Sequence, residues 1–62
     1  MIVGTQAGMI TVRDAHTELG VREPFTVSRA QARIIASCLD HKGLHPLAAA
    51  DLRRAAEEAE IG

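Results

Sequence analysis

Apolar and polar residues alternate along two stretches in the first half of the chain, at 9–13 and at 24–27. A period of two is typical of strands that bury one face. Ile2 and Val3 are expected to start a further short strand, with a turn at residues 7–8. The pattern therefore predicts an N-terminal β-ribbon of two or three strands.

The second half carries helix signals, beginning at Ser28. Ser28 and Gln31 have the spacing of a capping box, in which each side chain bonds a free backbone N–H of the first helical turn. Gly43 follows Lys42 and suits the left-handed residue that ends many helices. These signals predict a helix over 28–42. Its buried face is expected to hold Ile34, Ile35, Cys38 and Leu39.

A second helix is predicted over 46–60, because Pro46 is favourable in a first helical turn and an alanine-rich stretch follows it. Alanine side chains permit a neighbouring helix to approach closely. We expect this helix to provide a self-association face made of Leu47, Ala48, Leu52, Ala55 and Ala56. Arg53 and Arg54 are the expected exposed contacts to a partner.

The predicted fold class is α+β, with the β-ribbon packed on a C-terminal two-helix hairpin. Residues 1–62 form a single small domain, divided into a strand and loop half at 1–27 and a helical hairpin at 28–62. A chain of this length buries only about 60% of its unfolded surface. Small domains usually gain stability from disulfides, a metal or a partner subunit.

One cysteine, Cys38, excludes a disulfide within the chain and is typical of a reducing compartment. The remaining options are a well-packed monomer, a metal site and oligomerisation. Phe25 is the sole aromatic residue, so the core buries little area per residue. We therefore expect a homodimer.

The net charge of −1, with acidic and basic residues interspersed, argues against a dedicated nucleic-acid binder. Residues 1–12 lack the basic start and long apolar run of a secretory signal or a membrane span. We expect a cytoplasmic protein with no membrane contact, no cofactor and, as partners, itself and another protein.

Cys38, His41 and His45 follow the spacing C-x2-H-x3-H, and His16 is a possible fourth ligand. Thiolate and imidazole are the ligands of closed tetrahedral zinc sites. The alternative is structural. Cys38 is then an ordinary buried residue, His41 a cation favoured in the last helical turn by the helix dipole, and His45 a turn residue. The structural interpretation is preferred, and a zinc-stabilised domain is kept as an alternative.

Three polar residues alternate at Asp14, His16 and Glu18. If this stretch is extended, the three side chains lie on one side of it and offer a cation site or a polar face. The favoured interpretation is a solvated edge, where charges discourage pairing with other strands.

The segment from Phe25 to Ala56 resembles the first two helices of a winged-helix module, which implies DNA binding. It departs from that pattern because no residues remain for a recognition helix and wing. Glu57, Glu58 and Glu60 would also face phosphates unfavourably. A truncated helix-turn-helix regulator is therefore an alternative function.

Cys38 with His41 is the one conceivable nucleophile and base pair, and Cys38 is expected on a buried face, so no enzyme activity is predicted. The composition, short and rich in alanine and arginine, resembles that of small uncharacterised accessory proteins of high-GC bacteria and their phages. The expected function is a non-enzymatic protein-interaction or regulatory module.

Overall fold

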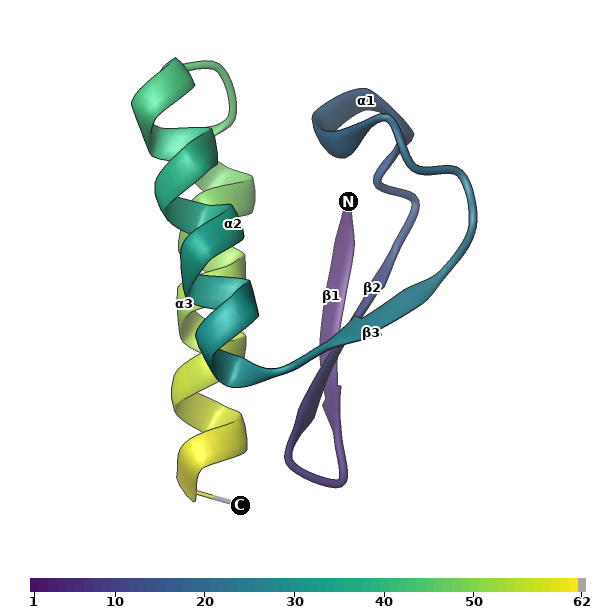
Figure 1. Cartoon of the computed structure of the whole chain (residues 1–62), viewed down its shortest axis with the longest axis vertical. Coiled ribbons are helices and arrows are strands. Elements are labelled where there is room, and N and C mark those ends of the chain that lie inside the picture. Colours follow the sequence, from purple (N-terminus) through teal and green to yellow (C-terminus); the bar gives the residue numbers. More distant parts are fainter. Residues whose placement is uncertain (62) are drawn as a thin grey trace.

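A computed structural model describes residues 1–61 and has two layers, a three-stranded antiparallel sheet and a helical hairpin (Figure 1). In chain order the elements are β1 Ile2–Gln6, β2 Met9–Arg13, α1 His16–Leu19, β3 Phe25–Val27, α2 Arg29–Lys42 and α3 Pro46–Ile61. The helices α2 and α3 pack together beside one face of the sheet. The predicted α+β class, with its strand half and its helical hairpin, is confirmed.

The first two strands form a tight hairpin, and its turn lies at residues 7–8 as the sequence predicts. Ala7 and Gly8 have φ values of 52° and 78°. Two positive φ values are the property of a type I′ turn, whose twist matches that of the flanking strands. Gln6 and Met9 therefore pair directly, and the register continues without a bulge to the start of β1.

The central strand β2 pairs with β1 on one side and with β3 on the other. Ile10 and Val12 face the helices and are fully buried, whereas Met9 and Arg13 are exposed. This is the alternation that the sequence predicts. Pro24, which lacks a backbone donor, lies just before the edge strand β3, where that loss is tolerated.

The stretch after β2 is folded differently from the extended edge that the alternation of Asp14, His16 and Glu18 suggested. Asp14 has a φ of 56°, and the chain then forms the single turn α1, which ends at Gly20 with a φ of 70°. Asp tolerates this left-handed conformation better than most residues do. A four-residue helix is too short to produce a readable periodicity. The expectation of one extended polar face is therefore wrong.

Both ends of α2 are capped by the residues that the sequence indicated. The hydroxyl oxygen of Ser28 accepts a hydrogen bond from the backbone N–H of Gln31 at 3.1 Å. At the other end Gly43 has a φ of 69°, and its N–H is shared between the carbonyls of Leu39 and Asp40. A side chain at position 43 would be strained in this conformation. The chain then enters α3 at Pro46.

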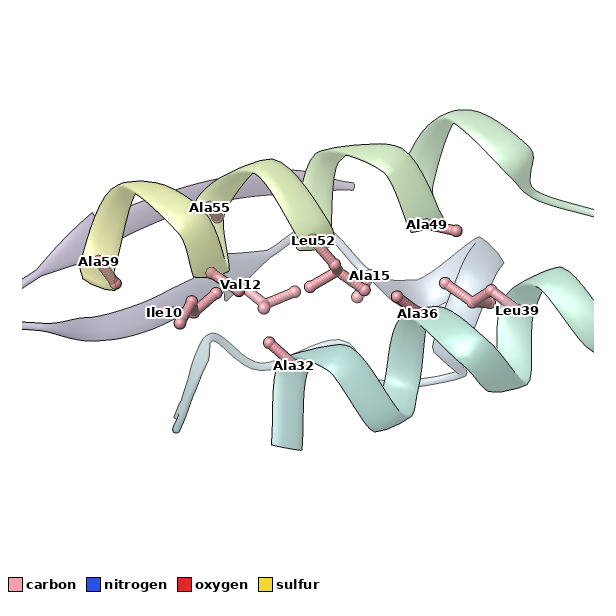
Figure 2. Close-up of a cluster of buried hydrophobic side chains, with 11 residues drawn as sticks. Ile10, Val12, Ala15, Ala32, Ala36, Leu39, Ala49, Leu52, Ala55 and Ala59 are labelled. Atoms are coloured by element: carbon pink, nitrogen blue, oxygen red, sulfur yellow. The ribbon is translucent and has the colours of Figure 1, made fainter. Parts of the chain in front are cut away.

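The core lies between the helices and the sheet, and alanine dominates it (Figure 2). Its four larger side chains are Ile10, Val12, Leu39 and Leu52. The rest are small: Ala15, Ala32, Ala36, Ala49, Ala55, Ala56 and Ala59. Alanines from both helices permit α2 and α3 to approach closely while both contact the sheet.

The buried face of α2 differs in part from the one predicted. Leu39 is buried and Ile35 is partly buried, but Ile34 and Cys38 are exposed. Two core alanines of α2 take the places expected for the larger residues, because only small side chains fit where α2 meets both α3 and the sheet. The amphipathic pattern therefore predicted the helix correctly but assigned the buried face to the wrong side of it.

We predict that Leu52→Ala lowers the free energy of unfolding by about 2–5 kcal/mol, because it opens a cavity among the few large core side chains. Leu47→Ala, in the same helix, is the matched control: Leu47 is 81% exposed, so its truncation should change stability by less than about 0.5 kcal/mol. Urea unfolding followed by circular dichroism measures both. Equal losses in the two variants would contradict this assignment of the core.

Candidate functional site

The outer face of α2 carries a shallow hollow, named here the α2 hollow. It is lined by Arg33, Ile34, Ser37, Cys38, His41 and Lys42. These residues recur at the spacing of one helical face, pointing away from the buried side of α2. Ile34, 56% exposed, and Cys38 supply apolar surface, and the basic side chains border it. The arrangement suits contact with another surface rather than enclosure of a small substrate.

The four residues considered for zinc are not brought together. Cys38 and His41 lie on the outer face of α2, His45 follows the turn and is half-buried, and His16 lies in α1. Over residues 1–61 no three His, Cys, Asp or Glu side chains are grouped closely enough to hold a metal ion. The physical reason is the turn at Gly43, which directs His45 toward α1 and away from the outer face of α2.

The five residues predicted as a self-association face do not form one exposed surface. Leu52, Ala55 and Ala56 are buried in the core of their own chain, and Ala48 is partly buried against it. Leu47 is highly exposed and lies near the start of α3. The prediction of this face is wrong, because the stripe packs on the sheet and on α2. The predicted homodimer itself stays a prediction.

The two arginines predicted as partner contacts are exposed, and each pairs with a carboxylate of its own chain. Arg53 forms an ion pair with Asp40 of α2, and Arg54 donates a hydrogen bond to Asp51 at 2.7 Å. Exposed pairs of this kind contribute little to stability. They do, however, neutralise the one basic doublet of the chain, which disfavours its use as a phosphate-binding site.

A second hollow lies where the hairpin tip approaches α1, and is named here the tip hollow. It is lined by Glu18, Leu44, His45, Pro46, Leu47 and Ala48. Leu44 is 69% exposed and Leu47 is 81% exposed, so two of the apolar side chains that line this hollow face solvent. Glu18 supplies its acidic group, although the sequence suggested this residue only as part of an extended polar face with Asp14 and His16.

Glu18 is held by the amino group of Met1. The Met1 nitrogen donates to Oε2 at 2.9 Å, and the Glu18 side chain is only 16% exposed. The other oxygen, Oε1, is buried and has no hydrogen-bond partner among the described residues. This contact joins positions far apart in the sequence, so no local pattern signals it.

The hydrogen bond from Met1 is the main cause that holds the pKa of the Glu18 carboxyl below its ordinary value of 4.5. Burial opposes this by raising the pKa. A backbone hydrogen bond and the electrostatic interactions with the Met1 amino group and with His45 lower the pKa of Glu18 further. The carboxylate is therefore the favoured form of Glu18 in the folded chain.

Comparisons with protein-family models, with curated proteins and with solved structures gave no match to this chain. No family is assigned on that basis. Among the described residues, no helix is long and apolar enough to cross a membrane.

We predict that the Glu18 contact makes stability depend on pH. Because the pKa is lower in the folded state, the stabilisation is present above the ordinary value of 4.5 and is lost as the pH falls through the folded-state pKa. Glu18→Gln should be less stable than the parent at neutral pH, and the two should converge in acid. Urea unfolding at a series of pH values measures this difference.

Acetylation of the Met1 amino group is the matched control for Glu18→Gln. It removes the positive charge of the other partner, so it should weaken the same pH dependence and add little in combination with Glu18→Gln. A stability difference between parent and variant that stays constant from neutral to acid pH would contradict the assigned ion pair.

Proposed function

We propose that the chain is a non-enzymatic protein-interaction or regulatory module that acts through the outer surface of its helical hairpin, as a homodimer. The observation that carries this proposal is the exposure of aliphatic side chains on the hairpin. Ile34, Leu44 and Leu47 are 56%, 69% and 81% exposed. Ile34 lines the α2 hollow, and Leu44 and Leu47 line the tip hollow, so both hollows of the hairpin offer exposed aliphatic surface to a partner.

The chemistry of the α2 hollow supports a protein partner. Protein interfaces have an apolar centre and a polar rim. Ile34 and Cys38 supply the apolar part here, and His41 and Lys42 supply a basic border. Among residues 1–61 no ion pair involves Lys42, whereas Arg33 is paired with Glu60. A partner helix with an apolar stripe and acidic flanks matches this surface best.

The experiment is a pull-down from a lysate with the tagged chain, divided into arms with and without nuclease and identified by mass spectrometry. We predict that one protein is recovered in both arms. Ile34→Glu should reduce its recovery roughly tenfold, the effect of losing about 1.4 kcal/mol of binding free energy. The physical reason is that a carboxylate replaces an exposed aliphatic side chain of the α2 hollow.

Thr26→Glu is the matched control, because it adds the same charge on the exposed face of the sheet, away from the hairpin. It should leave recovery unchanged. Equal recovery with Ile34→Glu and Thr26→Glu would overturn the hairpin surface as the binding site. Proteins recovered only without nuclease would instead favour the helix-turn-helix alternative, with Arg53 and Arg54 as the next residues to change.

A further inference from the structure

We propose that two copies of the chain join through the free edge of β1, which pairs with β1 of the second copy in antiparallel orientation to form one continuous sheet. This inference rests on the homodimer in the proposed function and deepens it by naming the surface where the copies meet. The surface is defined as the β1 edge, residues 2–6, together with the side of α3 that lies next to it.

The backbone groups that the β1 edge offers follow from its turn. In the type I′ turn at Ala7 and Gly8, the carbonyl of Gln6 is placed to accept from the N–H of Met9, so this pair exchanges its hydrogen bonds. Antiparallel pairs alternate between bonded and non-bonded. The N–H and C=O groups of residues 3 and 5 therefore point away from β2, toward the free edge.

The β1 edge lacks the features that natural proteins use to protect an edge strand. Residues 2–6, Ile-Val-Gly-Thr-Gln, contain no charge and no proline, and their pairing with β2 has no bulge. Among the described residues β1 pairs with β2 alone. The opposite edge is protected better, because β3 has only three residues and follows Pro24.

The edge is complementary to itself about a two-fold axis at Gly4. Antiparallel pairing centred there places Val3 of each copy opposite Thr5 of the other, so their edge-facing backbone groups bond in both directions. Gly4 then meets Gly4 of the second copy as a non-bonded pair, where the backbones come closest. Because glycine has no side chain, the two backbones can approach closely at Gly4.

The two-fold axis stands perpendicular to the sheet, so the helices of both copies lie on the same face and the two α3 helices become neighbours. Figure 2 shows α3 running alongside β1. Arg53 and Glu60 face α2 through their ion pairs. Half a turn away, the opposite flank carries Asp51 and Glu58, with Arg54 beside them.

This flank of α3 is charged in an alternating order, acid, base and acid, at Asp51, Arg54 and Glu58. When the two antiparallel flanks are offset by one helical turn, Arg54 of each copy lies opposite Glu58 of the other, so opposite charges meet. No ion pair among the described residues involves Glu58. A standard interface covers about 800 Å² on each partner. That is about a fifth of the 4130 Å² surface of the chain, so the β1 edge and the adjoining flank of α3 provide enough area for such an interface.

Thr5→Pro tests the edge, because it removes one edge-facing donor and leaves the pairing with β2 intact. Sedimentation equilibrium over a concentration series should show a dimer for the parent chain. Thr5→Pro should weaken dimerisation at least tenfold. Thr5→Val, the matched control, keeps the N–H and the branched shape and should dimerise as the parent does. A folded Thr5→Pro chain that dimerises normally, or a parent chain that is monomeric throughout, would overturn the proposal.

Amide hydrogen exchange of the parent chain provides a test that needs no variant, in case Thr5→Pro fails to fold. The N–H groups of residues 3 and 5 should exchange slowly at concentrations where the dimer forms and at least tenfold faster after dilution to monomer. Fast exchange of both amides in the dimer would refute the β1 edge. The Ile34→Glu chain should still dimerise, because Ile34 lies outside the β1 edge. Loss of partner capture without loss of dimerisation therefore tests the α2 hollow, and loss of dimerisation tests the β1 edge.

Discussion

The close contact between two alanine-lined helices is the constraint on which the rest of this structure depends. Alanines on both α2 and α3 bring the helices near each other, and the largest fully buried side chains among the described residues are Ile10, Val12, Leu39 and Leu52. Burial stabilises by about 0.8 kcal/mol for each CH₂ removed from water, so an alanine contributes little beside Leu52 or Ile10. The same contact fixes the rotation of α2, and that rotation places Ile34 and Cys38 in solvent.

Charged side chains reinforce the antiparallel arrangement of the two helices at the surface. Glu60 lies near the end of α3, where the helix dipole disfavours an acid, but it meets Arg29 and Arg33 from the first turns of α2. Arg53 and Asp40 join the helices closer to the hairpin turn. Each exposed pair is worth less than about 1 kcal/mol. Their shared effect is to disfavour other registers of α3 along α2, because a shift would place like charges together.

Local signals predicted most of the fold, because caps and turns depend on neighbouring residues. Ser28, Gly43 and Pro46 marked the helix ends, and the Ala7–Gly8 turn set the first strand pair. The site was predicted poorly. Which face of a helix is buried depends on what packs against it, and here alanine was favoured over larger residues for reasons of space. The Met1–Glu18 contact joins the residue before β1 to α1, which no periodicity reveals.

The two proposed surfaces lie on different sides of the molecule, and this separation has a functional consequence. The β1 edge and the flank of α3 lie away from α2, whereas the α2 hollow lies on the outer side of the helical layer. In the proposed dimer, the two-fold axis perpendicular to the sheet places both helical layers on the same face, with the two hairpins running in opposite directions. The proposed dimer would therefore carry both copies of the α2 hollow on that face, with the two α3 helices between them. On this proposal, a partner with two matching sites would bind the second at a high effective concentration, and avidity would strengthen attachment to a small and shallow surface.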